Sequence, residues 1–240
     1  MLFSNKKNIS EKEIHLYTIK LENTPIKFSE INFDLSTQDL ATVDKFKFDK
    51  DRKRFIISRY FLRTLLADYL GTPTKEIRII TNHYGKPELD STIQKNIQFN
   101  ISHSGHFILF AINLNNEIGI DIEKIDGTIN HLEIAENYFS NDEIRLLKKT
   151  GKKEDMIKNF YYIWTRKEAL LKAIGIGLLP DLKKISVIYN HFDLDLELNQ
   201  LNFDKKNIWN IESLEIDNSY KTALAYEGKT KKILIKNIDW

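Results

Sequence analysis

Acidic side chains recur in this sequence at spacings that could hold a divalent cation. Residues 117–123 read EIGIDIE, so apolar and polar side chains alternate as they do along a β-strand. Asp121 and Glu123 would then share one face, about 7 Å apart at about 3.3 Å per residue. Such carboxylates repel each other unless a cation lies between them, and Mg²⁺ prefers oxygen ligands. The alternative is the polar outer face of an edge strand, which this motif alone favours.

A third carboxylate lies in the longest predicted helix, residues 154–174. On a helical wheel, Glu168 falls inside the apolar stripe of this helix, where a carboxylate is costly unless it is paired or bound to metal. Lys172 is one turn further on and on the same side. This position favours a functional role for Glu168 over a surface Glu–Lys pair. The stripe consists of Ile157, Phe160, Tyr161, Trp164 and Leu171.

Two further segments carry groups that bind phosphate. Lys86 lies between Gly85 and Pro87 in a predicted turn, and Ser102 and His103 lie in the sequence NISHSG at the end of a predicted strand. Ser102 and His103 are not a nucleophile–base pair, because neighbours on a strand point to opposite faces and no orienting acid is evident. Taken alone, this segment is more typical of an ordinary hairpin.

A basic cluster precedes the first long helix and includes Arg54. The common interpretation of such a cluster is a solvated face, although an arginine at a helix amino terminus can also hold phosphate. The sequence contains neither a Walker loop nor a G-x-G-x-x-G motif. The cluster consists of Lys50, Arg52, Lys53 and Arg54.

The elements that must position these residues fall into two similar halves. Each half contains several strand patterns and one dominant helix, at residues 51–70 and 154–174. Asn115-Asn116 is the best break between them, which gives lobes of residues 1–115 and 116–240. The sequence therefore predicts an α+β fold of two similar-sized, pseudo-symmetric lobes, each a small sheet packed with a long helix.

Further elements are expected along both halves. Shorter helices are predicted near residues 36, 131–138 and 141–149. The strands expected before the break are 14–21, 76–81, 98–102 and 107–114, the last two forming a hairpin. Those expected after it are 117–123, 183–190, 192–198, 208–216, 220–226 and 231–236.

Composition removes several classes of function. The chain has 240 residues, 36 basic and 34 acidic side chains, a net charge of +2 and no cysteine. Disulfides, thiol nucleophiles and cysteine-ligated metals are excluded, and the near-neutral balance argues against nucleic acid or a membrane surface as partner. With neither a signal-peptide pattern nor a long apolar segment, we expect a cytoplasmic protein.

Four motifs in order resemble one family. They are YGKP at residues 84–87, FNISHSG at 99–105, IGIDIEK at 118–124 and FYYIWTRKEALLK at 160–172. This series resembles the 4'-phosphopantetheinyl transferases, specifically the surfactin-synthetase-activating (Sfp) type, a single chain of two α+β lobes. Each motif alone is weak, but all four in order, over about residues 46 to 190, are specific.

The resemblance implies a reaction and a set of site residues. Coenzyme A would donate its 4'-phosphopantetheine arm to a serine of an apo carrier protein, leaving 3',5'-ADP. Asp121, Glu123 and Glu168 would hold Mg²⁺, Glu168 would act as the base, and Lys172 would neutralise the pyrophosphate. The coenzyme A contacts implied are Arg54, Lys86, Ser102 and His103 at the adenine-side phosphates, Pro87 at the adenine, and Lys167 and Lys172 near the pyrophosphate.

Several points stay open after the resemblance. Thr165 stands where members often carry serine, and residues 36–44 lack lysines that some members use for the 3'-phosphate. The carrier could be an acyl or peptidyl carrier of fatty-acid, polyketide or nonribosomal peptide synthesis. It would dock near Asp126-Gly127, and the family type implies a monomer. The alternative from another class is a non-catalytic module that binds coenzyme A or a carrier protein.

Overall fold

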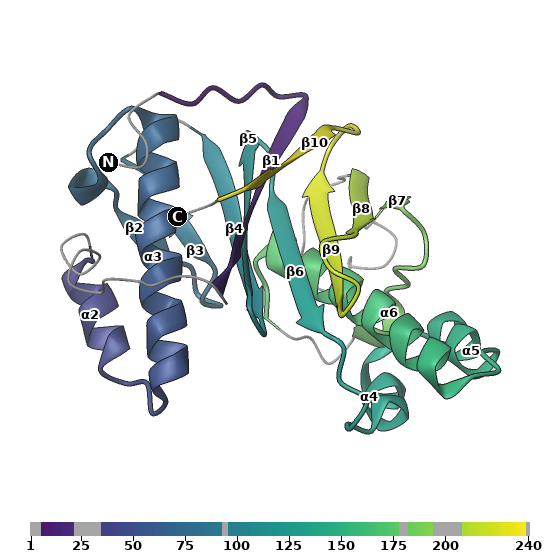
Figure 1. Ribbon diagram of the computed structural model, residues 1–240. Coiled ribbons are helices and arrows are strands. Elements are labelled where there is room, and N and C mark those ends of the chain that lie inside the picture. The colour runs from purple at the N-terminus through teal and green to yellow at the C-terminus, as the bar shows by residue number, and fades with distance from the viewer. Residues whose placement is uncertain (1–5, 22–34, 93–95, 178–181, 194–207, 239–240) are drawn as a thin grey trace.

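Two four-stranded sheets form the centre of the molecule, and a long helix covers the outer face of each (Figure 1). The computed structural model describes residues 6–21, 35–92, 96–177, 182–193 and 208–238. The first sheet has the strand order β10-β1-β5-β4, and the second has the order β6-β9-β8-β7. The predicted α+β fold is therefore confirmed.

The first sheet contains strands from both ends of the chain. Its elements are β1 (Glu13–Lys20), β4 (Ile97–Ser104), β5 (Phe107–Leu114) and β10 (Lys232–Asn237). Strands β4 and β5 form the predicted hairpin, and β5 pairs antiparallel with β1. The last strand, β10, crosses over and pairs with β1 in parallel.

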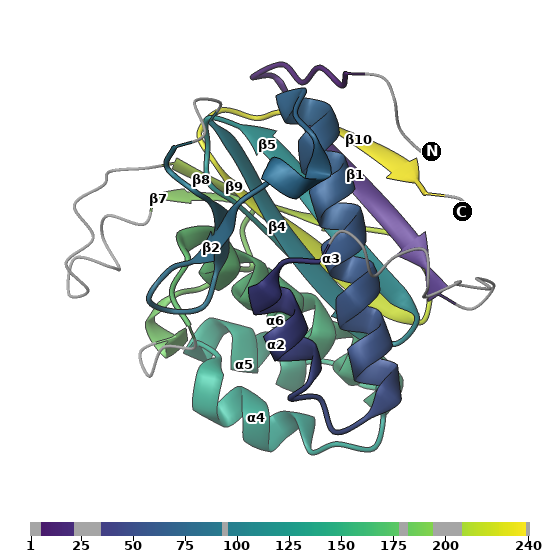
Figure 2. The same cartoon turned by 90° about the vertical axis from the view of Figure 1, so that its left-hand side faces the viewer.

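Helices α2 and α3 and a small ribbon complete this part of the molecule. Their bounds are α2 (Thr37–Val43), α3 (Asp49–Leu70), β2 (Ile79–Thr81) and β3 (Pro87–Leu89). The strand expected at residues 76–81 begins only at Ile79, because a short 3-10 helix, Thr74–Glu76, comes first. Figure 2 shows α3 lying across the first sheet.

The second sheet follows the linker at Asn115-Asn116. Its strands are β6 (Ile118–Lys124), β7 (His191–Asp193), β8 (Ile208–Leu214) and β9 (Tyr220–Glu227). Its helices are α4 (His131–Tyr138), α5 (Asn141–Lys148) and α6 (Lys153–Ile174). None of the described helices has the length and apolar composition needed to cross a membrane.

The two long helices, α3 and α6, are alike in length and in their ends. Each has 22 residues and ends at a glycine in the left-handed region, Gly71 at φ 71° and Gly175 at φ 80°. A glycine reaches this conformation without the steric cost that a Cβ atom brings. The ends expected at residues 70 and 174 are therefore confirmed.

The first sheet is buried on both faces. On β5, Ile108, Phe110 and Ile112 pack towards α3, whereas Leu109 and Ala111 pack towards the second sheet. The face of β6 formed by Ile118, Ile120 and Ile122 belongs to this inter-sheet core. Because side chains alternate along a strand, the remaining side chains of β6 point the other way, towards α6.

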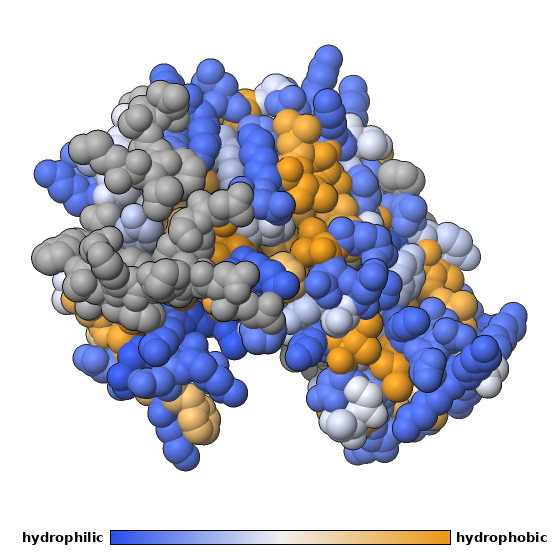
Figure 3. Space-filling view, viewed as in Figure 1, coloured by the Kyte–Doolittle hydropathy of each residue, from blue (hydrophilic) through white to orange (hydrophobic). Residues whose placement is uncertain are grey.

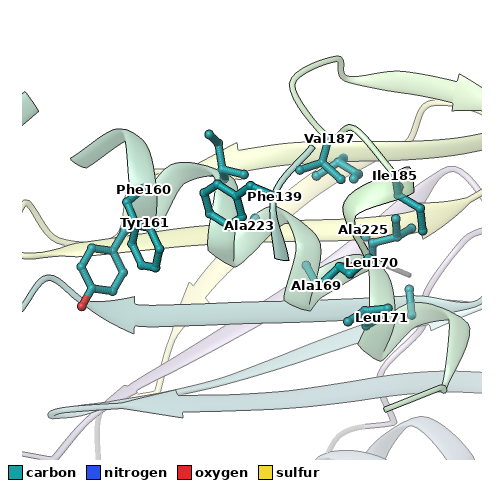
Figure 4. Close-up of a cluster of buried hydrophobic side chains, with 14 of the residues drawn as sticks. Phe139, Phe160, Tyr161, Ala169, Leu170, Leu171, Ile185, Val187, Ala223 and Ala225 are labelled. Atoms are coloured by element: carbon teal, nitrogen blue, oxygen red, sulfur yellow. The ribbon is translucent and has the colours of Figure 1, made fainter. Parts of the chain in front are cut away.

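Helix α6 is buried around most of its circumference. Figure 4 shows its side chains between the segment carrying Ile185 and Val187 on one side and β9 on the other. Trp164 is only partly buried and stacks on Phe160. The single apolar stripe expected from the helical wheel is thus too narrow, since Ile163, Ala169 and Leu170 are also fully buried.

The strand predicted at residues 183–190 is wrong. The segment begins in a 3-10 helix, Leu182–Lys184, and continues as an irregular chain. Several of its backbone groups pair with buried charged side chains: Arg166 donates to the carbonyls of Val187 and Tyr189 at 2.6 Å each. Of the strand predicted at 192–198, residues 192 and 193 lie in β7 and the rest lies outside the described residues.

Candidate active site

Strand β6 places two carboxylates where the sheets and α6 meet. Asp121 is only 2% exposed, and Glu123 is partly buried. Although β6 is an edge strand of the second sheet, β4 and α6 lie against it, so its carboxylates do not form a solvated outer face. β6 runs towards a hollow in the lower edge of the molecule, between α3 and α4 (Figures 1 and 3).

Helix α6 approaches β6 very closely because residue 119 is glycine. A Cβ atom at Gly119 would lie 2.0 Å from the carbonyl oxygen of Ala169 and 2.3 Å from the nitrogen of Ala173. Both contacts are with backbone, so a larger side chain would have to displace the helix. This approach brings Glu168 and Lys172 over the carboxylates of β6.

The ammonium group of Lys172 pairs with Asp121. Its Nζ atom lies 2.6 Å from Asp121 Oδ1 and donates to Ser102 Oγ at 3.1 Å. Ser102 in turn donates to Asp121 Oδ1 at 3.0 Å. Residues from β4, β6 and α6 therefore meet at one carboxylate oxygen.

The electrostatics of this cluster resist a full set of negative charges. Burial, reinforced by the negative charge of Asp121, raises the pKa of Glu168 to about 7. Burial and Asp121 also raise the pKa of Glu123. The negative charges of Asp121, Glu123 and Glu168 thus repel one another, and the positive charge of Lys172 does not offset this repulsion.

Two oxygens in the cluster have no hydrogen-bond partner. Asp121 Oδ2 and Glu168 Oε1 are buried, and nothing among the described residues donates to either. Buried carboxylate oxygens without donors fit a hard cation, which takes oxygen ligands. Within the described ranges, however, no three acidic or histidine side chains are arranged as a preformed set of metal ligands. Lys172 also lies against Asp121.

A pocket of about 230 Å³ lies beside this cluster, and Lys86, Pro87, Glu168 and Lys172 are among the residues that line it. Lys86 is nearly buried, and its Nζ atom pairs with Glu117 at 2.6 Å and donates to the carbonyl of Ala173 at 2.8 Å. Lys86 therefore connects the turn before β3 to the residue preceding β6 and to α6.

Arg54 and His103 form a second pair near the hairpin. Arg54 Nη1 lies 3.5 Å from His103 Nδ1, and Asp51 lies 4.0 Å from the same guanidinium group. Desolvation and the positive charge of Arg54 lower the pKa of His103, so its imidazole is neutral and accepts from Arg54. The structure thus brings together residues that are 49 positions apart in the sequence.

Lys167 is not part of this assembly, which corrects its expected place near the pyrophosphate. Its side chain is fully buried, its Nζ atom lies 2.9 Å from Glu143, and it also donates to the carbonyls of Leu182 and Ile185. Neighbouring residues on a helix point about 100° apart, so Lys167 cannot share the direction of Glu168. It supports the irregular segment after α6 instead.

Sequence reasoning assigned no role to three residues that build the site: Asn100, Ser104 and Gly119. Asn100 and Ser104 flank Ser102 at a spacing of two on β4 and contact β6. Their signal in the sequence is this polar alternation, which runs opposite the alternation of residues 118–124. Which strand they face is decided only by tertiary packing.

Comparisons with known proteins show which family this chain resembles. A model of the 4'-phosphopantetheinyl transferase superfamily matches residues 117–225, and a model described as 4'-phosphopantetheinyl transferase, N-terminal, matches residues 22–115. The 4'-phosphopantetheinyl transferase HetI of Nostoc sp. is 34% identical over 167 residues, which cover 69% of this chain and 70% of HetI.

Two further relatives are similar over larger parts of this chain. The 4'-phosphopantetheinyl transferase Sfp of Bacillus subtilis is 32% identical over 75% of this chain and 76% of its own length. The L-aminoadipate-semialdehyde dehydrogenase-phosphopantetheinyl transferase of Homo sapiens is 28% identical over 80% of this chain, which spans 62% of the human protein. Every one of these names denotes a transferase, which favours an enzyme over a non-catalytic binding module.

Proposed function

The chain belongs to the 4'-phosphopantetheinyl transferase superfamily, and from this we propose that it transfers the 4'-phosphopantetheine arm of coenzyme A to a serine of an apo carrier protein. The serine oxygen bonds to the phosphorus that bears the pantetheine arm, the pyrophosphate P–O bond breaks, and 3',5'-ADP leaves. The observation that carries the proposal is the meeting of Asp121, Glu168 and Lys172 beside a pocket.

Glu168 is the proposed base for the carrier serine. Efficient general bases have a pKa near the working pH, and burial beside Asp121 raises the pKa of Glu168 to about 7. The Glu168 carboxylate would accept the serine proton, directly or through water. Lys172, which lines the same pocket, would neutralise charge on the pyrophosphate as 3',5'-ADP leaves.

Asp121, Glu123 and Glu168 are the proposed ligands of a Mg²⁺ ion. Support comes from the two buried oxygens without donors and from the raised pKa values of Glu123 and Glu168. When bound, the ion would supply positive charge for the pyrophosphate oxygens. Lys172 would move from Asp121 towards the phosphates, since a cation bound to the same carboxylate would repel its ammonium group.

The coenzyme would lie along the junction of the lobes. We place its adenine against Pro87 in the pocket and its adenine-side phosphates near Lys86, Arg54 and His103. We leave Lys167 out, because its ammonium group is fully buried against Glu143. Because consecutive halves of one chain match the two family models, we also propose the Sfp type, with lobes of residues 1–115 and 116–240 in a monomer.

The test is a mass measurement on the carrier. The protein is mixed with coenzyme A, Mg²⁺ and either an apo acyl carrier or an apo peptidyl carrier, and each carrier is weighed by mass spectrometry. We expect a gain of one phosphopantetheine on at least one of them, and the faster of the two identifies the client class. A protein that modifies neither carrier would contradict the proposal.

A chelation arm of the same assay tests the metal. EDTA should abolish transfer and excess Mg²⁺ should restore it, because the phosphate charges would otherwise face three carboxylates. Full turnover in EDTA would leave the carboxylates with a structural role only. Size-exclusion chromatography with light scattering checks the proposed monomer, and a dimeric mass would contradict it.

A further inference from the structure

The outer edge of β6 is paired with side chains instead of a strand. Its backbone N–H groups at Ile120, Ile122 and Lys124 point away from β9 and towards β4. There they donate to Asn100 Oδ1 at 3.0 Å, Ser102 Oγ at 3.2 Å and Ser104 Oγ at 3.0 Å. Polar side chains at a spacing of two thus replace the carbonyls of a missing strand.

Two of these side chains make a second, repeated contact. Ser102 donates to Asp121 Oδ1 at 3.0 Å, and Ser104 donates to Glu123 Oε2 at 2.9 Å. Each hydroxyl therefore makes two hydrogen bonds to β6. It accepts from one backbone N–H and donates to the carboxylate of the residue that precedes that N–H in the sequence. The repeat holds both carboxylates of β6 in one register.

From this repeat we propose that Ser102 and Ser104 are positioning residues, which orient the Asp121 and Glu123 carboxylates towards a divalent cation. The inference rests on the proposed function, since it concerns the same cation. It assigns the two hydroxyls to the carboxylates and not to the phosphates of coenzyme A.

The hydrogen-bond capacity of Ser102 supports this assignment. A hydroxyl group has one proton to donate and two lone pairs to accept with. Ser102 donates to Asp121 and accepts from Ile122 N and Lys172 Nζ, so its proton is committed. A phosphate would need that proton, because phosphate oxygens only accept. The contacts leave Asp121 Oδ2 without a donor and available to a cation.

Ser104 gives the sharper variant, because it lies at the end of β4 and is only partly buried. Ser104→Ala removes the hydroxyl, and Ser104→Thr retains it. The control is Thr222→Val on β9, opposite Ile122, because Thr222 is buried as Ser102 is and its hydroxyl has no partner among the described residues. Ser102→Ala is the parallel variant on the deeper serine, and thermal unfolding shows whether each protein remains folded.

The experiment measures Mn²⁺ binding by electron paramagnetic resonance, in the presence of coenzyme A and without a carrier protein, so that nothing turns over. Removing a group that orients a metal ligand weakens metal binding by about 10- to 100-fold. We expect that loss for Ser104→Ala and Ser102→Ala, an affinity near wild type for Ser104→Thr, and no change for Thr222→Val. In transfer assays, the Mg²⁺ concentration for half-maximal rate should rise while the KM for coenzyme A changes little.

Two results would overturn the inference. One is wild-type Mn²⁺ affinity in a folded Ser104→Ala protein. The other is weaker coenzyme A binding by Ser104→Ala or Ser102→Ala than by wild type when EDTA is present. A hydroxyl that contacts the phosphates would contribute to coenzyme binding even without metal. Failure of the proposed function gives a different result. If Ser104→Ala binds Mn²⁺ more weakly than wild type but the wild-type protein modifies no carrier, the positioning role stands and the transferase activity does not.

Discussion

The fold opposes a negative charge at Glu168. Its neighbours are the carboxylates of Asp121 and Glu123, and its surroundings are the buried side of α6. A group in such a position lowers the stability of the protein while it serves a function. This is the usual signature of an active site, in which a local energetic conflict is kept because the ligand resolves it.

The pKa of Glu168 gives a stability prediction with a definite sign. A carboxyl group whose pKa is raised from 4.5 to about 7 in the folded state stabilises the fold when protonated. That stability is present below pH 4.5 and is lost as the pH rises through about 7, with an upper limit of roughly 3 kcal/mol. Above pH 8, Glu168→Gln should therefore be more stable than wild type by about 1–3 kcal/mol and deficient in transfer.

Urea unfolding at pH 5 and pH 8 measures this difference, and Glu154→Gln is the control. Glu154 lies in the first turn of the same helix and is exposed, so its removal should not change the pH dependence. Equal stability of wild type and Glu168→Gln at both pH values would show that the Glu168 carboxylate meets no opposition in the fold.

Lys172 is expected to compete with a cation for Asp121. Its ammonium lies 2.6 Å from Asp121 Oδ1. Lys172→Met should therefore tighten Mn²⁺ binding to the coenzyme-free protein by about 10-fold, although transfer should fall by about 100-fold or more because a charge on the pyrophosphate is lost. Paramagnetic titration reports the first effect, and Lys158→Met, an exposed lysine on the same helix, is the control. Weaker Mn²⁺ binding in Lys172→Met would contradict the competition.

At the scale of elements, the distance between β6 and α6 decides whether a site exists. Gly119 allows the contact with Ala169 and Ala173, and that contact places Glu168 over Asp121. Neither the strand nor the helix alone carries this information. The glycine within the motif IGIDIE is therefore a packing requirement as well as part of a sequence pattern.

Gly119→Ala tests this requirement. The added Cβ would lie 2.0 Å from a backbone oxygen, so we expect a loss of about 3 kcal/mol or more in the free energy of unfolding. Gly151→Ala is the matched control, since a Cβ there meets nothing within 4 Å, and it should change stability by less than about 1 kcal/mol. Denaturant unfolding of the two variants gives the comparison, and equal stabilities would refute the close-packing argument.

At the scale of the whole molecule, the two halves of the chain share a sheet. β10 leaves the second half of the chain and completes the first sheet beside β1. Before it, the buried Lys231 donates to Asn113 of β5 at 2.7 Å and to Asn116 of the linker at 2.8 Å. Two regions about 115 positions apart in sequence are thus held together where the lobes meet.

Separated lobes should not fold independently. A fragment of residues 1–115 would lack β10 and would expose the inter-sheet face of β1 and β5 to water. We expect no near-ultraviolet circular dichroism signal and no cooperative unfolding from this fragment alone, and recovery of both when residues 116–240 are co-expressed. Cooperative unfolding of the isolated fragment would show that the first lobe is self-sufficient.

The sequence alone determined the local features of this protein. Both long helices, the short helix near residues 141–149 and the β4–β5 hairpin follow from periodicity and short-range chemistry, and the structure confirms them. The family also followed from residues in order along the chain. These features depend on neighbours within a few positions, which is why a linear pattern specifies them.

Only the tertiary structure decided which residues each element contacts. The alternation at 183–190 predicted a strand, but buried charges from α6 occupy its backbone groups. Lys167 was expected near the pyrophosphate, but it pairs with Glu143. The contact of Ser104 with Glu123 depends on the packing of β4 against β6. The direction in which a side chain points is set by the conformation of its own segment. The groups that it meets there depend on long-range packing, which the pattern of one segment does not specify.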